Sequence, residues 1–364
     1  MYGEHDYEVL TSAREGLQRQ EDHFGSKQRH DTDGYNIIPF GYCTYRNRSD
    51  DGKYAFNINT ISEKAIVSKF YPVFRFTNAN STFMAEFLNS SPRVKKKLSV
   101  LAVGTSQVVL SFEALKAAKF DLPCKDEQDK IAAFLECLNT RIENQRTLVV
   151  ALKKYKRGLS KAVFSTNSEL FPKSTVASLG ELFPFIRNGF VGTVTPFFTS
   201  QENGVRYLQG TNIHDGKISD ETAFYVTQAF NQKHSKNILK SNDILVVQSG
   251  HVGECAVVGD NYAGSNCHAL IIMNNGGECA SDYICQYINS DDGKKKIAAI
   301  TTGNTIKHIL ATSIANIEVP LPSKKDQQRI AELLNSWDNR IEQEIRNLCK
   351  LVRIKEGLLQ QLFI

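Results

Sequence analysis

Residues 122–145 read LPCKDEQDKIAAFLECLNTRIENQ, and residues 321–344 read LPSKKDQQRIAELLNSWDNRIEQE. The two stretches lie 199 residues apart in the chain, and over 122–164 against 321–363, 15 of the 43 aligned positions carry the same residue. A self-match at a fixed offset is the signature of an internal repeat. We therefore predict two copies of one unit, each made of a globular part followed by a better-matched helical part.

The helical parts carry a regular apolar pattern. Apolar residues recur at alternating steps of four and three residues in both copies, which is typical of a heptad seam between paired helices. Pro123 and Pro322 stand just before the two stretches, where the missing N–H of proline costs little. Ser323 followed by Asp326 predicts an N-terminal cap. We expect the helices to pair through Ile131, Leu135, Leu138, Ile142 and Leu152 and through Ile330, Leu334, Trp337, Ile341 and Leu351.

Two seams of equal length in one chain most simply pack on each other, in an antiparallel pair. In the alternative, each helix lies on its own domain or pairs with another chain. The seams carry polar residues at the same two steps, and these residues are expected to fix the register of the pair: Gln145, Lys156, Glu344 and Lys355.

The globular parts contain short runs typical of strands. Residues rich in β-branched and aromatic types, bounded by glycines, predict strands over 42–45, 54–57 and 71–76 in the first copy and over 243–247, 255–258 and 269–273 in the second. Short helices are expected over 82–89 and 281–288. The predicted fold class is therefore α+β, with two domains of mixed α/β structure separated by two long antiparallel coiled-coil helices in a pseudo-twofold internal repeat.

The bulk composition places the chain among ordinary multidomain proteins. It has 364 residues, 41% of them hydrophobic and 23% charged, with a net charge of +5 that is compatible with a nucleic-acid partner. No apolar run is long enough to predict a membrane span, and the first residues do not read as a signal peptide. The eight cysteines form no C-x-x-C pair, which favours reduced thiols in a cytoplasmic protein.

The motifs of common enzyme classes are missing from the sequence. It contains no G-x-x-x-x-G-K-[ST] phosphate loop, no G-x-G-x-x-G after a predicted strand, and no Pro-Pro pair of the kind found in adenine methyltransferases. We therefore predict no catalytic residue, no metal site and no directly bound cofactor in this chain.

Several polar segments suit a nucleic-acid surface instead. Arginine and asparagine side chains read guanine and adenine edges, and lysines suit phosphates, although lysine runs equally fit a solvated helix face. The first copy contributes Tyr45, Arg46, Asn47, Arg48, Lys53, Lys95, Lys96, Lys97 and Gln107 to the candidate DNA-binding set. The second copy contributes Gln248, Ser249, His251, Lys294, Lys295, Lys296 and Lys307.

The repeated motif resembles the conserved regions of type I restriction specificity subunits. In both copies Leu-Pro and a polar cap are followed by Glu-Gln or Asp-Gln, then Lys/Arg-Ile-Ala, and the seam ends in Gly-Leu-x-x-x-x-Phe. Asn242-Asp243-Ile244-Leu245, with Ser249-Gly250 behind it, is similar to a strand and loop of that family's recognition domains. The segments 104–107 and 303–307 resemble the family's domain-closing segment.

The resemblance implies a non-catalytic, sequence-specific DNA-binding subunit. Each globular part would read one half of a bipartite site in double-stranded DNA, and the helix pair would set the distance between the halves. Two methyltransferase (M) subunits would dock on the chain and restriction/translocase (R) subunits would join them. S-adenosylmethionine, ATP and Mg would belong to those partners.

The expected domains follow from the repeat and the resemblance. They are a first target-recognition domain over 1–121, a first conserved helix over 122–165, a second target-recognition domain over 166–320 and a second conserved helix over 321–364. At an offset of 199, Met1 falls opposite Ser200, whereas the second domain begins near Thr175, so we expect the first domain to be short at its N-terminus.

Two other classes of function remain open at this point. One is a coiled-coil assembly protein that reads no bases, and the other is an enzyme with an unfamiliar site.

Overall fold

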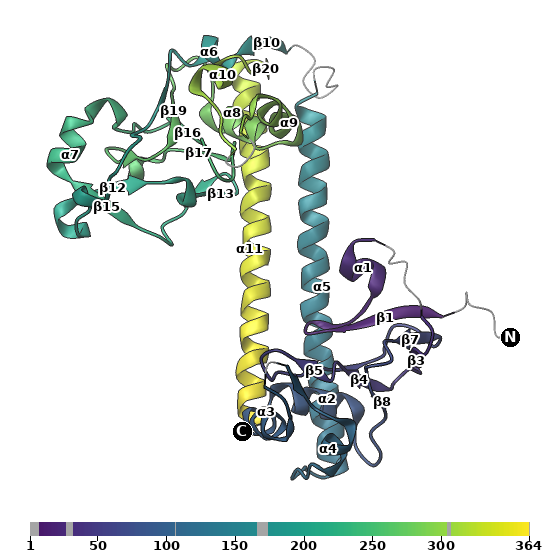
Figure 1. Ribbon diagram of the computed structural model, residues 1–364. Helices are drawn as coiled ribbons and strands as arrows, with labels where there is room; N and C mark the ends of the chain where they lie inside the picture. Colours follow the sequence, from purple (N-terminus) through teal and green to yellow (C-terminus); the bar gives the residue numbers. More distant parts are fainter. Residues whose placement is uncertain (1–6, 27–31, 106, 166–173, 304–306, 364) are drawn as a thin grey trace. The chain divides into compact units, whose positions relative to one another are not determined.

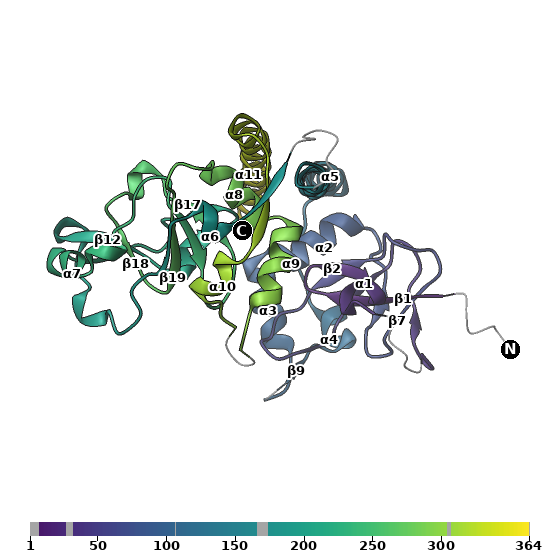
Figure 2. The same cartoon turned by 90° about the horizontal axis from the view of Figure 1, so that it is seen from above.

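Two helices of 39 residues each dominate the computed structural model: α5 (Lys125–Val163) and α11 (Lys324–Leu362). Figure 1 shows them among the other elements, and Figure 2 shows them end-on. The structure describes residues 7–26, 32–105, 107–165, 174–303 and 307–363. No helix in this described part is long and apolar enough to cross a membrane.

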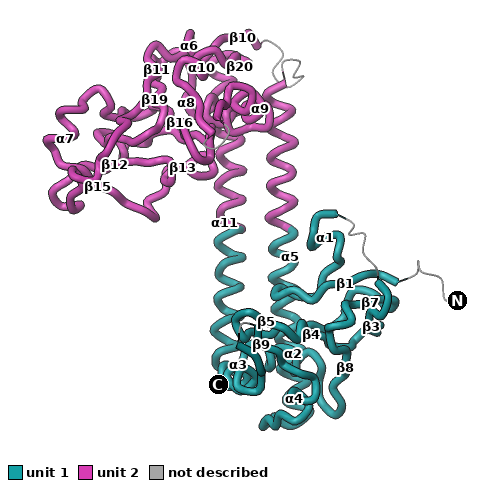
Figure 3. The backbone as a smooth tube through the Cα atoms, viewed as in Figure 1, with its two compact units in different colours: residues 1–147, 345–364 teal, residues 148–344 magenta. Residues whose placement is uncertain are grey.

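The chain forms two compact units. Unit 1 comprises residues 1–147 and 345–364, and unit 2 comprises residues 148–344 (Figure 3). Both boundaries fall inside the long helices, so α5 begins in unit 1 and ends in unit 2, whereas α11 begins in unit 2 and ends in unit 1. Each unit therefore contains one globular part and a part of each long helix.

Unit 1 contains two small sheets, in the strand orders β2–β1–β7–β3 and β6–β4–β8, and a pair β5–β9. Short helices pack on the second sheet, where Tyr45 and Phe56 contact Leu88 and Leu98 in one apolar cluster. The elements before α5 are β1 (Glu8–Ala13), β2 (Gly16–Arg19), α1 (Gln20–Phe24), β3 (Asn36–Ile37), β4 (Cys43–Tyr45), β5 (Arg48–Ser49), β6 (Phe56–Ile58), β7 (Ala65–Val67), β8 (Val73–Phe74), α2 (Ser81–Ser90), α3 (Pro92–Leu101), β9 (Val108–Val109) and α4 (Phe112–Ala117).

Unit 2 has a larger sheet, ordered β11–β19–β16–β17, beside the sets β15–β12–β18, β13–β14 and β10–β20. Helix α8 packs between this sheet and α11, as Figure 2 shows, and its Tyr283 and Ile284 join Ile330 and Leu334 in one core. The elements are β10 (Thr175–Ser178), α6 (Leu179–Leu182), β11 (Phe185–Asn188), β12 (Gly204–Leu208), β13 (Ile213–His214), β14 (Lys217–Ile218), β15 (Phe224–Thr227), α7 (Gln228–Lys233), β16 (Ile244–Val247), β17 (Cys255–Val257), β18 (Asn266–Cys267), β19 (Leu270–Asn274), α8 (Ser281–Ile288), α9 (Asp291–Ile300), α10 (Ala311–Ala315) and β20 (Glu318–Leu321).

The two units repeat one another in topology and in register. In unit 1, Cys43 on β4 pairs with Ile58 on β6 and with Phe74 on β8. In unit 2, Ile244 on β16 pairs in the same way with Val257 on β17 and Met273 on β19. Four helices follow in each unit, α2 to α5 and α8 to α11. The internal repeat predicted from the sequence is confirmed.

Each long helix is anchored at its start by a buried glutamine from the repeated motif. The Gln128 side chain accepts a hydrogen bond from the backbone N–H of Asn80 (3.0 Å) and donates one to the carbonyl oxygen of Pro123 (2.9 Å). Gln327 makes the same two bonds in unit 2, with the N–H of Ala280 (2.9 Å) and the carbonyl of Pro322 (2.9 Å). The helix start is thereby fixed to the globular part that precedes it. The predicted cap is confirmed, since the backbone N–H of Asp326 donates to Ser323 Oγ (3.2 Å).

The far end of each helix packs on the other copy's globular part. In unit 1, Phe363 and Leu359 at the end of α11 share an apolar cluster with Phe83, Ile131 and Leu135, near the start of α5. In unit 2, the end of α5 packs against the start of α11, where Leu159, Val163 and Phe164 share a core with Ile330 and Leu334. The helices therefore run antiparallel in both units, and the predicted fold class is confirmed.

The predicted seam residues lie on the packed faces of both helices. Five of them are buried, namely Leu135, Ile142, Ile330, Leu334 and Ile341. The other five are half-buried, namely Ile131, Leu138, Leu152, Trp337 and Leu351.

The two seam lysines, Lys156 and Lys355, form equivalent networks with exchanged partners. Lys156 Nζ lies 2.6 Å from Asp338 Oδ1, and Asp338 Oδ2 accepts a hydrogen bond from the Gln286 side chain (2.7 Å). In unit 1, Lys355 Nζ lies 2.9 Å from Glu86 Oε1, which also accepts from the Asn139 side chain (3.3 Å). The carboxylate comes from the long helix in unit 2 but from the globular part in unit 1. Each network ties a seam lysine to a globular part.

Candidate nucleic-acid interface

In unit 1 the connection from β4 to β6 carries four of the nine predicted DNA-binding side chains, namely Arg46, Asn47, Arg48 and Lys53. Arg46 and Arg48 are exposed, and Asn47 is half-buried between them. Arg48 lies on β5, which pairs with β9, and the neighbouring Gln107 donates a hydrogen bond to Asp50 Oδ1 (3.0 Å). The structure therefore brings the predicted arginines and Gln107 together on one edge of unit 1.

Two features of this edge suit a ligand such as DNA, which carries both negative charge and hydrogen-bond donors. The Arg48 guanidinium lies over the exposed Phe70 ring, 5.2 Å from its centre, a contact that holds the cation at the surface. The side-chain oxygen of Asn47 is buried and lacks a hydrogen-bond partner within the described residues. Such a group gains stability from an added donor. Lys53 is exposed, with its ammonium 3.9 Å from Asp51 Oδ2.

Tyr45 does not belong to this edge, and its prediction as a DNA-binding residue requires correction. The side chain is fully buried, and its hydroxyl donates a hydrogen bond to the carbonyl oxygen of Leu110 (2.9 Å). Burial raises the pKa of Tyr45 far above its ordinary value. The alternation of side chains along β4 turns this ring into the core while Arg46 beyond it faces solvent.

In unit 2 the equivalent connection runs from β16 to β17 and holds Gln248, Ser249 and His251. Ser249 is exposed and pairs with His308, next to the exposed Lys307. The backbone N–H of Ile309 donates to the Gln248 carbonyl (3.1 Å). These predicted residues are therefore gathered at one place, as in unit 1.

In both units an isolated β-bridge brings these polar residues together. Val103 pairs with Val109 in unit 1, and Thr302 pairs with His308 in unit 2, each 199 residues further along. Ser106 and residues 304–306, which belong to the segments enclosed by these bridges, lie outside the described residues.

The two lysine runs lie at equivalent places on α3 and α9. Their first two members are exposed, namely Lys95, Lys96, Lys294 and Lys295. The third member has a structural contact, since Lys97 donates to the Lys119 carbonyl and Lys296 to the Glu318 carbonyl. Lys97 is nevertheless exposed, and Lys295 has an ion-pair partner too, 3.5 Å away at Asp292 Oδ1. Phosphate contacts remain predictions for all six lysines.

The buried thiols are poorly suited to nucleophilic chemistry. Five of the eight cysteines are buried: Cys43, Cys255, Cys267, Cys279 and Cys285. Burial raises the pKa of Cys267 to about 12 and that of Cys279 to about 11, which disfavours the reactive thiolate.

The residues that position Arg48 and Gln107 on this edge carry no signal in the sequence. Phe70 lies 22 positions beyond Arg48 and carries no local signal of the contact. The hydrogen bond between Gln107 and Asp50 could not be predicted either, because neither residue spacing nor apolar periodicity indicates that β5 pairs with β9.

Comparisons with known proteins agree with this layout. A family model described as the type I restriction modification DNA specificity domain matches residues 4–152 and 169–350. The chain is 25% identical over 258 residues to the type I restriction enzyme MjaVIII specificity subunit of Methanocaldococcus jannaschii. That alignment covers 67% of this chain and 61% of the relative, so the chain spans about three fifths of the relative's length.

Two solved structures share the fold. One is the S subunit of a type I restriction-modification system from M. genitalium, with a TM-score of 0.60 at 17% identity, covering 99% of this chain and 89% of that one. The other comes from a structural study of complex assembly and conformational transition of the type I R-M system. It has a TM-score of 0.56 at 17% identity and covers 91% of this chain and 83% of that one.

Proposed function

Because the chain belongs to the family of the type I restriction modification DNA specificity domain, we propose that it is the DNA-reading subunit of a type I restriction-modification complex. It supplies sequence specificity and catalyses nothing by itself. The observation that carries this proposal is the duplicated unit, in which the same connection gathers polar side chains in both copies. We call these two groups of polar side chains the reading edges: Arg46, Arg48 and Gln107 in unit 1, and Gln248, Ser249 and Lys307 in unit 2. Two similar reading edges suit a DNA site made of two half-sites.

Each unit reads one half of a bipartite site in double-stranded DNA. The contacts to DNA are made by the reading edge of each unit, with Arg46, Arg48 and Gln107 in unit 1 and Gln248, Ser249 and Lys307 in unit 2. Guanidinium and amide groups present the donor and acceptor patterns that distinguish base edges, whereas lysines add contacts to phosphates. The long helices set the distance between the half-sites, since each is anchored on both globular parts.

The partners are two methyltransferase subunits, joined by restriction/translocase subunits, in the cytoplasm where they act on DNA. S-adenosylmethionine, ATP and Mg belong to those partners. The support for two like partners is a pair of exposed apolar positions that repeats at the 199-residue offset. Phe134 and Tyr155 on α5 are 50% and 58% exposed, and Leu333 and Ile354 on α11 are 40% and 53% exposed. Exposed apolar groups at repeated positions are suited to binding two copies of one partner.

Binding to a random pool of DNA duplexes tests the reading function. The full chain, assembled with methyltransferase subunits, is expected to enrich two short motifs at a fixed spacing, with an affinity that falls as salt rises. Equal retention of all sequences would instead favour the alternative of a coiled-coil scaffold that reads no bases.

The double variant Phe134→Glu with Leu333→Glu is expected to lose methyltransferase binding by at least about tenfold. A charge at an exposed position leaves the fold intact but must be desolvated in an apolar interface. Co-purification measures the partner, and thermal unfolding checks the fold. The matched control is Val100→Glu on α3, where the side chain is 77% exposed and lies outside the long helices. Unchanged binding by the double variant would remove these positions from the docking surface.

Arg48→Ala is expected to relax the choice of base at one position of one half-site. A bidentate arginine contact to guanine discriminates by about 1–3 kcal/mol, so competing bases at that position should become acceptable. Selection from the same pool measures the change, with the exposed Arg93→Ala on α3 as control. Uniform weakening on every sequence would identify Arg48 as a phosphate contact.

A further inference from the structure

A tight turn in unit 2 places His251 beside Glu254. The turn joins β16 to β17, and the backbone N–H of Gly253 donates to the Val247 carbonyl (2.9 Å) while the N–H of Val247 donates to the Glu254 carbonyl (2.8 Å). Gly253 has a φ of +91°, and a Cβ there would lie 2.4 Å from Ile297 Cγ2. Only glycine fits, so the shape of this turn is fixed.

A second hairpin brings His214 to the same place. Strands β13 and β14 are joined by Asp215 and Gly216, both at positive φ (+49° and +80°), which is the geometry of a two-residue hairpin turn. The hairpin packs against β17. The rings of His214 and His251 stack with centres 5.1 Å apart and an interplanar angle of 18°.

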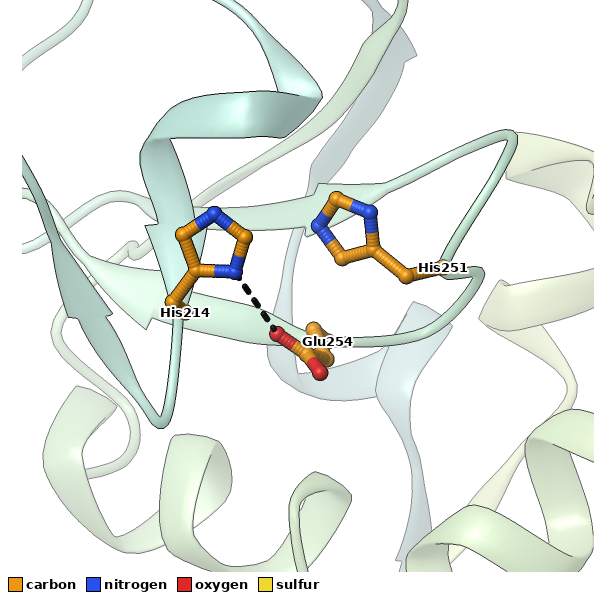
Figure 4. A group of neighbouring side chains, drawn as sticks. All are labelled: His214, His251 and Glu254. Atoms are coloured by element: carbon orange, nitrogen blue, oxygen red, sulfur yellow. Dashed lines mark ion pairs between the residues drawn. The ribbon is translucent and has the colours of Figure 1, made fainter. Parts of the chain in front are cut away.

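The three side chains can each offer one ligand atom to a shared ion. These atoms lie within 4.8 Å of one another, and Figure 4 shows the rings and the carboxylate grouped together. His214 Nδ1 lies 3.9 Å from Glu254 Oε2 (Figure 4). Ligand atoms around a tetrahedral zinc ion are about 3.3 Å apart, given metal–ligand distances near 2.0–2.2 Å. Closing the cluster therefore needs only small side-chain movements, and His214 is exposed at the hairpin.

Two further observations point to a missing ligand. Glu254 Oε2 is buried and has no hydrogen-bond partner within the described residues, an arrangement that costs free energy. His214 Nε2 lies 2.8 Å from the carbonyl oxygen of Thr211. A carbonyl only accepts, so Nε2 carries the hydrogen, and in the neutral ring the lone pair of Nδ1 faces Glu254, where a metal ion can take it. Metal-binding histidines commonly donate their other N–H to a backbone carbonyl in this way.

His251 has a similar backbone neighbour. Its Nε2 lies 3.1 Å from the carbonyl oxygen of Ile213. A half-turn of an imidazole ring exchanges its nitrogen and carbon positions with little change in packing, so this ring can present either nitrogen.

We propose that His214, His251 and Glu254 form a zinc site. Two imidazoles and one carboxylate are a ligand set that zinc accepts, with a fourth position left for water or another oxygen or nitrogen ligand. The ion would join the β13–β14 hairpin to the connection that holds Gln248 and Ser249, and so would stiffen that connection. This site has no sequence signature, because His214 and His251 are 37 positions apart and follow no metal-binding spacing.

Titration of the full chain with Zn²⁺ alone, after removal of metals with a chelator, tests the site without DNA or partners. We expect one ion per chain, and binding at least about tenfold weaker in both His214→Ala and Glu254→Gln. Co²⁺ in place of Zn²⁺ should give the visible absorption of a tetrahedral ion. The control is His23→Ala, an exposed histidine of unit 1 whose loss should change nothing.

The Glu254→Gln variant preserves the shape of the side chain, so it can be measured even if an alanine variant fails to fold. Zn²⁺ should raise the unfolding temperature of the unmodified chain but not that of Glu254→Gln. Failure of the folded chain to bind Zn²⁺, or binding by the Glu254→Gln and His214→Ala variants as tight as that of the unmodified chain, would overturn the proposal and leave a plain His214–Glu254 ion pair. Neither outcome bears on DNA reading, which is measured separately.

Discussion

Phe363→Ala is expected to destabilise unit 1 by about 3–5 kcal/mol, the usual loss when a buried phenylalanine becomes alanine. The Phe363 ring is 3% exposed and packs edge-on against Phe83 (5.5 Å between ring centres) and Phe87 (5.7 Å). Its removal leaves a cavity beside Leu135 and frees the end of α11 from the first globular part. Urea unfolding, followed by hydrogen exchange of unit 1, measures the loss.

The chain offers two matched controls for this variant. Phe134→Ala removes the same side chain from α5, but this ring is 50% exposed, so its loss should cost much less. Phe164→Ala removes the equivalent residue in unit 2, where the ring packs on Tyr283 and Tyr287, and should destabilise unit 2 instead. If Phe363→Ala cost no more than Phe134→Ala, the anchoring of α11 on unit 1 would be wrong.

The long helices were predictable because their signals are local and occur twice. The heptad seam, the prolines and the cap all lie within a few residues of one another, and the observed helices begin at Lys125 and Lys324, at the predicted offset. The short strands β4, β16 and β19 were equally visible as apolar runs between glycines.

The contacts between distant segments were not predictable from one sequence. The ion pairs Lys156–Asp338 and Lys355–Glu86 join residues that are far apart in the chain. The carboxylate comes from the long helix in one pair and from a globular part in the other. Tyr45 was misplaced for a related reason, since aromatic residues next to arginines occur both at surfaces and in cores, and the pleat of β4 decides between them. The cluster around His251 depends on the packing of a hairpin against β17. Periodicity reports which face of an element is apolar, but it does not report which element covers it.

Lengthening both long helices by one heptad is expected to lengthen the spacer between the half-sites by about three base pairs. Seven residues add about 10.5 Å to a helix, and DNA rises about 3.4 Å per base pair. They also turn the helix by about 700°, only some 20° short of two full turns, so the seam stays nearly in register. Insertions after Thr147 in α5 and after Glu344 in α11 place the added heptads where each helix passes from one unit to the other.

The half-sites themselves should not change, because the insertion touches neither reading edge. Selection of bound duplexes from a random pool measures motif and spacing together, so the two effects are separated in one experiment. An insertion in α5 alone is the matched control: one lengthened helix cannot keep both of its anchors, at Gln128 and Phe164, while α11 keeps its original length. This control should lose binding instead of shifting the spacing. An unchanged spacer in the doubly lengthened protein would show that the helices do not set the distance between the half-sites.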